Sequence, residues 1–210
     1  MLYWLLLGVR GLAHLLPYIT GFKIAGTLGK CSFHLLSKEK EKTLLHLRLA
    51  FGHEKSEKEL REVGEKVFEH FGQTLFELAM LDRIIPRFDD YVYATGYENF
   101  DKGLKAGKGV ICTIAHFGNW EIMGGYTAMK GYPCVVIARK IYFEKYDKLL
   151  VDIRNRMKVE MIYRTDSVRE MVKVLKNNRM LGFVVDQDVD SVEGVFVNFF
   201  GRPAFTPIAP

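Results

Sequence analysis

The sequence predicts an α/β fold: a mostly parallel, mixed β-sheet flanked by helices, with amphipathic helices ahead of it. Three observations lead to this prediction. From residue 110 onward, short apolar runs that suit buried strands alternate with segments of helical periodicity. Each of these runs is followed at once by polar or charged residues. The first 36 residues, in contrast, are strongly apolar with scattered basic side chains, which is typical of helices that lie on a membrane surface.

Residues 1–37 are predicted to form a membrane-associating helical segment. Arg10 interrupts the first apolar stretch, and Pro17 and Gly21 separate it from a second one at about 22–36. No uncharged run reaches the roughly 18 residues that a membrane-spanning helix needs, and no signal-peptide pattern is found. We therefore expect two amphipathic helices against the cytoplasmic leaflet. A short or tilted span and a soluble helical hairpin are the alternatives.

The positive charge of the chain is concentrated in the same N-terminal part. The formal net charge is +5 at pH 7, and residues 1–48 hold seven basic against two acidic side chains. Basic residues beside apolar ones favour an anionic membrane surface as partner, where each contributes roughly 1 kcal/mol. Nucleic acid is not expected as a partner, because its binding sites combine basic, polar and aromatic faces rather than leucine runs.

No cofactor and no metal site is predicted. The three cysteines, at 31, 112 and 134, lack CxxC spacing and are expected to be reduced thiols, as is usual in the cytoplasm. The histidines show neither HxxxH nor HExxH spacing, and Walker A and GxGxxG loops are absent. A GxSxG motif is missing as well. The substrate itself, through a hydroxyl or a water, is therefore the expected source of any nucleophile.

Residues 38–210 are predicted to form the α/β domain. Lys38–Lys42 is a solvated helix start or a linker, and Ser56 with Glu59 forms a capping-box pattern that opens a long helix. That helix is expected to end at 84–86. Residues at helical spacing along it predict a face packed in the core, with the lining of an acyl-chain channel as the alternative: Leu60, Val63, Val67, Phe71, Leu75 and Leu78, widened by Phe68, Phe76 and Ala79.

The sheet is predicted from residue 111 onward. Parallel strands joined by right-handed crossovers end at one edge, where open α/β sheets bind their ligands. Strands are expected at 111–115, 133–138, 159–163, 180–185 and 195–199, and helices at 98–105, 143–157 and 167–177, with another beginning near residue 120. The side chains that follow the first four strands are therefore expected at the same edge: His116, Arg139, Arg164 and Asp186.

The segment 116–121, His-Phe-Gly-Asn-Trp-Glu, is the most informative one. The glycine and the asparagine predict a tight turn after the strand, with Asn119 as the N-cap of the next helix. This turn allows the carboxylate of Glu121 to reach back to the imidazole of His116. The pair predicts a general base, His116, with Glu121 as its orienting acid. A strand-end histidine bonded into the core is the alternative.

Arginines at the same edge suit a phosphate or another anionic group. Together with the lipid-facing N-terminal segment, they predict acyl transfer onto a phosphorylated membrane lipid. The H-x4-E spacing of 116–121 also resembles the glycerolipid acyltransferase superfamily, and its HxGNWE form is similar to the bacterial lipid A biosynthesis (late, Kdo-dependent) acyltransferase family. Further segments carry the resemblance: 47–51, Glu77, 154–156, 186–188, 199–201 and 206–207.

This resemblance implies a glycerolipid-acyltransferase-like fold in an enzyme at the cytoplasmic face of the inner membrane. It would move a fatty acyl chain from acyl carrier protein, or from acyl-CoA, to a hydroxyl of a phosphorylated glycolipid such as a lipid A precursor. Related enzymes acylate phosphoinositol mannosides. Family members continue past the Thr-Pro segment, so the C-terminal part of the domain is expected to be missing. A lysophosphatidate-type acyltransferase and a non-catalytic membrane-surface protein are the rival interpretations.

The resemblance also assigns roles to residues of this sequence. It implies that His116 deprotonates the acceptor hydroxyl and that Glu121 orients it. Arg154 and Asp186 match positions that the family associates with activity. Arg154 is expected to bind a phosphate of the lipid or of the carrier's prosthetic group. Asp186 is expected to hold the architecture of the site or an arginine.

Four weaker assignments complete the predicted substrate-binding set. Gly118 is expected to let the backbone approach the thioester, and Asn119 is placed beside it at the helix start. Arg139 and Arg164 follow from the strand-end argument alone.

Overall fold

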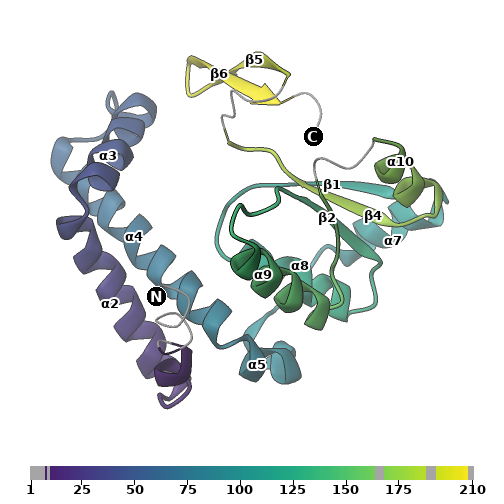
Figure 1. Cartoon of the computed structure of the whole chain (residues 1–210). Helices are drawn as coiled ribbons and strands as arrows, with labels where there is room; N and C mark the ends of the chain where they lie inside the picture. Colours follow the sequence, from purple (N-terminus) through teal and green to yellow (C-terminus); the bar gives the residue numbers. More distant parts are fainter. Residues whose placement is uncertain (1–7, 9, 164–167, 188–192, 208–210) are drawn as a thin grey trace. The chain divides into compact units, whose positions relative to one another are not determined.

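The computed structural model describes residue 8 and residues 10–163, 168–187 and 193–207 (Figure 1). The chain forms two compact units: residues 1–82 with 196–204, and residues 83–195 with 205–210. The boundary predicted at residue 37/38 falls inside the first unit, where one helix passes into the next. Arg164 lies outside the described residues.

The first unit is built mainly from three helices: α2 (Tyr18–Leu35), α3 (Ser37–Phe51) and α4 (Glu57–Ala79). Helices α2 and α4 pack along each other, and two glycines allow their backbones to approach closely. A Cβ atom built on Gly29 would lie 2.3 Å from the carbonyl oxygen of Phe68, and one on Gly72 would lie 2.3 Å from that of Ala25. Larger side chains at these two positions would therefore force the helices apart.

The predicted capping box is confirmed at the start of α4. The Ser56 hydroxyl accepts a hydrogen bond from the Glu59 N–H, and the Glu59 carboxylate accepts one from the Ser56 N–H at 2.8 Å. These bonds satisfy two of the N–H groups that a helix start leaves unpaired. The run 38–42 is the solvated start of α3, one of the two possibilities that the sequence leaves open.

The predicted core face of α4 is only partly correct. Leu60 is fully buried, but Val67, Phe71 and Leu75 are 48%, 60% and 52% exposed. The reason is that α2 and α3 pack against the side of α4 that carries Gly64, Gly72 and Phe76. Of these three residues, Phe76 belongs to the predicted stripe, and it is buried. Helix α4 ends at Ala79, before the predicted 84–86, and α5 (Leu81–Ile84), the 3₁₀ helix η1 (Ile85–Arg87) and α6 (Phe88–Tyr91) follow.

Helix α2 exposes several large apolar side chains. Ile19, Leu28 and Leu35 are among them, and the basic Lys23 and Lys30 of the same helix are exposed as well. That this helix lies on a membrane stays a prediction. Among the helices that the structure describes, none combines the length and the apolar composition needed to cross a bilayer.

The second unit contains a four-stranded sheet. Its strands are β1 (Val110–Ile114), β2 (Cys134–Ala138), β3 (Glu160–Tyr163) and β4 (Met180–Val184), in the order β1-β4-β2-β3. Every neighbouring pair is parallel, with Val110 opposite Met180 and Ile114 opposite Val184. The predicted α/β alternation is therefore confirmed, and the carboxyl ends of all four strands lie at one edge.

Helices cover both faces of this sheet (Figure 1). They are α7 (Tyr97–Lys105), α8 (Trp120–Met129), α9 (Glu144–Arg156) and α10 (Val168–Lys176). Because β1–α8–β2 and β2–α9–β3 both move across the sheet in the same direction, right-handed crossovers place α8 and α9 on one face. The return from β3 to β4 places α10 on the other, where it covers Val135 and Leu181 of the central strands.

The last two strands do not extend this sheet. Strands β5 (Gly194–Phe199) and β6 (Arg202–Pro207) pair with each other as a separate two-stranded sheet. Phe200 and Gly201 have φ values of 52° and 74°, and a two-residue turn with both φ angles positive closes a tight hairpin. The prediction of a mixed sheet is therefore wrong for the described residues, since the four-stranded sheet is parallel throughout.

Candidate active site

The turn after β1 places His116 at the carboxyl edge of the sheet. Gly118 has a φ of +60°, a left-handed conformation that glycine adopts most easily. The Asn119 side chain accepts a hydrogen bond from the Ile122 N–H at 3.2 Å, which confirms the predicted N-cap of α8. Strand, turn and helix start thus follow one another as the sequence predicts, and His116 lies outside the strand.

Asp186 holds the imidazole of His116. It follows β4, the strand next to β1. Its Oδ1 atom lies 2.7 Å from His116 Nδ1, and its Oδ2 atom accepts a hydrogen bond from the His116 N–H at 2.8 Å. One carboxylate therefore fixes both the ring and the backbone of the histidine. The Trp120 ring packs edge-on against the imidazole, with the ring centroids 4.9 Å apart.

This geometry favours one tautomer of the imidazole. A carboxylate at Nδ1 accepts a proton, so Nδ1 carries the N–H and Nε2 keeps its lone pair. Burial alone would raise the pKa of the Asp186 carboxyl, but the hydrogen bonds from the ring and from the backbone of His116 outweigh it and hold that pKa below its usual value. Asp186 is therefore a carboxylate at neutral pH, as an orienting acid must be.

Glu121 does not take the place predicted for it. Its Oε2 atom accepts a hydrogen bond from Arg154 Nε at 2.9 Å, and its Oε1 atom accepts one from Arg154 Nη2 at 2.5 Å. Both side chains are only 11% exposed. The first turn of α8 directs the carboxylate toward the last turn of α9 rather than toward His116. The expectation that Glu121 orients His116 is therefore corrected: Asp186 does so.

The same ion pair changes the expectation for Arg154. Its Nη1 atom lies 3.0 Å from the Met161 sulfur, and the remaining contacts of its guanidinium are those to Glu121. A guanidinium enclosed in this way is not presented to a phosphate, so the predicted phosphate-binding role does not fit. Arg154 and Glu121 instead join the last turn of α9 to the first turn of α8, the helix that follows the His116 turn.

Arg139, the strand-end arginine predicted on β2, follows that strand and is exposed. Strand β4 lies between β1 and β2, so the ends of β1 and β2 are separated by two strand spacings, roughly 10 Å. Arg139 therefore shares the carboxyl edge with His116 without neighbouring it directly. Its role as a substrate ligand stays a prediction.

Asp147 is a buried charged residue that the sequence analysis missed. Its Oδ1 atom accepts a hydrogen bond from the Ile141 N–H at 2.8 Å, and its Oδ2 atom accepts one from the Tyr163 hydroxyl at 2.5 Å. The Tyr163 bond first and the Ile141 bond second hold the pKa of its carboxyl below the usual value. The only signal in the sequence is an aspartate in the first turn of a helix, which is too common to single out.

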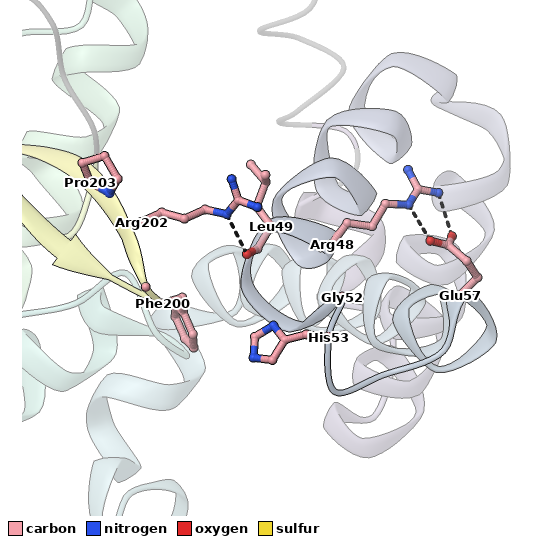
Figure 2. A pocket seen from close by; sticks show the side chains of 9 residues that line it. Arg48, Leu49, Gly52, His53, Glu57, Phe200, Arg202 and Pro203 are labelled. Carbon is pink, nitrogen blue, oxygen red and sulfur yellow. Dashed lines mark hydrogen bonds and ion pairs between the residues drawn. The ribbon is translucent and has the colours of Figure 1, made fainter.

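Two segments that carry the family resemblance meet in the first unit. The Phe51 and Phe200 rings contact each other edge-on at 5.0 Å, and Arg202 Nε donates to the Leu49 carbonyl at 3.3 Å. These segments line a hollow of about 840 Å³. Figure 2 shows its lining residues, with Arg48 turned toward Glu57 in an ion pair of two hydrogen bonds. The hollow is lined by Arg48, Leu49, Gly52, His53, Glu57, Phe200, Gly201, Arg202 and Pro203.

In the part of the chain that the structure describes, no three His, Cys, Asp or Glu side chains gather in a way that could hold a metal ion. The fold and the site together define a class of protein: an α/β domain with a histidine–carboxylate pair at the carboxyl edge of a parallel sheet. The chain belongs to the bacterial lipid A biosynthesis acyltransferase family, whose model matches residues 1–210.

Several curated proteins are similar to this chain. A phosphatidylinositol mannoside acyltransferase of Mycobacterium tuberculosis is 27% identical over 119 residues, which cover 55% of this chain and 37% of that protein. The enzyme of the same name from Mycolicibacterium smegmatis is 23% identical over 68% of this chain and 47% of its own length. A lipid A biosynthesis acyltransferase of Haemophilus influenzae is 23% identical over 88% of this chain and 58% of its own length. In each case the match spans less than two thirds of the relative.

Proposed function

We propose that this protein transfers a fatty acyl chain from a thioester donor, acyl carrier protein or acyl-CoA, to a hydroxyl of a phosphorylated glycolipid. The observation that carries the proposal is the 2.7 Å contact between His116 Nδ1 and Asp186 Oδ1. It leaves Nε2 as a base, and a base at the edge of a parallel sheet deprotonates a substrate hydroxyl. Membership of the acyltransferase family supports the same chemistry.

The reaction uses His116 twice. Nε2 takes the proton of the acceptor hydroxyl while its oxygen attacks the thioester carbonyl, and the new C–O bond gives a tetrahedral oxyanion. When that intermediate collapses, the C–S bond breaks and the imidazolium returns the proton to the departing thiolate. Asp186 stays ionised throughout and stabilises the imidazolium. Backbone N–H groups at the start of α8 are the proposed donors to the oxyanion.

Two classes of acceptor have support from named relatives. Similarity to a lipid A biosynthesis acyltransferase favours a lipid A precursor, and similarity to phosphatidylinositol mannoside acyltransferases favours a mannosylated phosphoinositide. Both are glycolipids that carry phosphate and are made in membranes. We propose accordingly that the enzyme works at the cytoplasmic face of the inner membrane, with the apolar and basic segment 1–37 on an anionic lipid surface.

Transfer of radiolabelled acyl chains from acyl carrier protein into each glycolipid tests the proposal. His116→Ala is expected to lower the rate by about 10²-fold or more, the usual effect of removing a general base. His70→Ala, at an exposed position of α4, is the matched control and should keep the full rate. Unchanged turnover by His116→Ala would rule the mechanism out. Lipid binding without transfer by the unmodified protein would favour a non-catalytic membrane-surface role, and acylation of lysophosphatidate alone would favour a glycerophospholipid acyltransferase.

A further inference from the structure

The loop after β2, residues 139–143, presents an unusual surface. Arg139 and Lys140 are exposed, and two exposed aromatic residues follow. Tyr142 is 93% exposed and Phe143 is 62% exposed, with their rings in edge-on contact at 5.1 Å. Two large rings held in water next to basic side chains form an amphipathic surface, which is typical of an interaction site. We call residues 139–143 the β2–α9 loop.

Buried contacts fix this loop in place. The Asp147 carboxylate accepts hydrogen bonds from the Ile141 N–H in the middle of the loop and from the hydroxyl of Tyr163, the last residue of β3. The Lys140 Nζ atom lies 6.0 Å from the centroid of the Tyr163 ring. The loop is therefore tied to α9 through its backbone and to β3 through the Asp147 and Lys140 side chains. The two exposed aromatic rings thus stand on a loop that is held in place.

The chemistry of the loop matches the interface of an anionic bilayer. Tyrosine and phenylalanine rings enter the boundary between lipid headgroups and acyl chains, and arginine and lysine bind the phosphates just outside it. The loop also lies at the carboxyl edge that carries His116 and Asp186, because β2 is the neighbour of β4. Binding of a membrane here would bring lipid headgroups to the edge of the sheet where the reaction is proposed to occur.

We propose that the β2–α9 loop is a membrane-docking loop of the second unit, separate from residues 1–37. Tyr142 and Phe143 enter an anionic bilayer, Arg139 and Lys140 contact lipid phosphates, and Asp147 positions the loop. The inference rests on the proposed function only in the choice of a lipid surface as the occupant. Nothing in it requires acyl transfer to take place.

A tryptophan placed at the tip of the loop tests the proposal. The variant Tyr142→Trp is added to phosphatidylglycerol vesicles that contain brominated lipid, which quenches indoles inside the bilayer, and the signal of the unmodified protein is subtracted. We expect a blue shift and strong quenching. Tyr93→Trp, at a position 90% exposed in the same unit, is the control and should show neither. Equal quenching of the two variants would overturn the proposal.

Charge and positioning are tested in the Tyr142→Trp background. Arg139→Gln with Lys140→Gln should lower the vesicle-binding constant, taken from a lipid titration of the quenching, by roughly fivefold for each charge removed. Asp147→Asn should weaken the quenching while the circular dichroism spectrum, which reports the fold, stays unchanged. Quenching equal to that of Tyr142→Trp alone would show that Asp147 does not position the loop.

The outcome is separable from that of the acyl-transfer assay. Quenching should persist with His116→Ala, whose docking loop is intact, so loss of turnover and loss of docking are read independently. The acidic donor protein is the competing partner for this surface. A spectral shift of Trp at position 142 with acyl carrier protein, without quenching by bromolipid, would show that the loop binds the donor and would overturn membrane docking.

Discussion

His116 Nδ1 and Asp186 Oδ1 lie 2.7 Å apart although 70 residues separate them in the chain. The contact exists because β1 and β4 are neighbours in the sheet, so the residues that follow these two strands meet at its edge. The second carboxylate oxygen accepts the His116 N–H, which fixes the backbone as well as the ring. The pair is thus positioned by the sheet itself.

This contact predicts which nitrogen of His116 carries the proton. Nitrogen-15 NMR of the histidine-labelled protein should show the neutral ring protonated at Nδ1, because the carboxylate accepts that N–H. In Asp186→Asn the ring should shift toward the Nε2-protonated form, since the amide can turn its own N–H toward Nδ1. An Nε2-protonated ring in the unmodified protein would contradict the assignment.

The ion pair between Glu121 and Arg154 should contribute to stability. Glu121→Ala leaves a largely buried guanidinium without its partner and should lower the free energy of unfolding by about 3 kcal/mol. Urea denaturation measures this. Glu170→Ala, which breaks an exposed pair with Lys173, is the control and should cost less than about 1 kcal/mol. An equal decrease in the free energy of unfolding in the two variants would show that the buried ion pair contributes no more to stability than the exposed one.

Acid should destabilise the protein through Asp147 and Asp186. Both carboxyl pKa values are lowered by hydrogen bonds in the folded protein, whereas in the unfolded chain an aspartate titrates near about 3.9. Such a group stabilises the fold fully above that unfolded value, and its contribution is lost as the pH falls through the lower, folded one.

Unfolding midpoints measured between neutral pH and about pH 3 should therefore fall less steeply with acid in Asp147→Asn than in the parent. Asp152→Asn, at an exposed position of the same helix, is the control and should follow the parent. A parallel pH profile for Asp147→Asn would contradict the role of its hydrogen bonds.

The cysteines should differ in reactivity. The pKa of the Cys134 thiol is raised to about 11, mainly by burial and secondly by the nearby Cys112. Cys31, in contrast, is exposed. Because the thiolate is the reactive form, a maleimide at pH 8 should label Cys31 first and Cys134 only after unfolding. Mass spectrometry of labelled peptides measures the order. Labelling of Cys134 in the folded protein at the rate of Cys31 would show that it is not buried.

Local features of the site were predictable from the sequence, and its long-range pairing was not. The strand, the turn at Gly118 and the Asn119 cap depend on neighbouring residues, and all are found. The partner of His116 depends on the strand order β1-β4-β2-β3, which no local pattern specifies. Glu121 was the nearest carboxylate in sequence, but the helix directs it to Arg154.

In helix α4, too, the sequence predicts local structure but not the long-range contact. Periodicity identifies residues that share a face, such as Val67, Phe71 and Leu75, but it does not say which face another helix will cover. The glycines at 64 and 72 lie on the covered face, where a Cβ atom would meet Phe33 and the carbonyl oxygen of Ala25, both in α2. The small residues on that face, beside the buried Leu60 and Phe76, were the signal that would have identified the contact.

The most direct test is the rate of acyl transfer by folded Asp186→Asn, measured with acyl carrier protein as donor and a phosphorylated glycolipid as acceptor, beside Asp152→Asn as control. If Asp186 orients the base, Asp186→Asn should lose about 10²- to 10⁴-fold in rate, as expected when an imidazole loses its orienting carboxylate. Asp152→Asn should keep the parent rate. A parent-like rate in both variants would contradict the assignment of His116 and Asp186 as the catalytic pair.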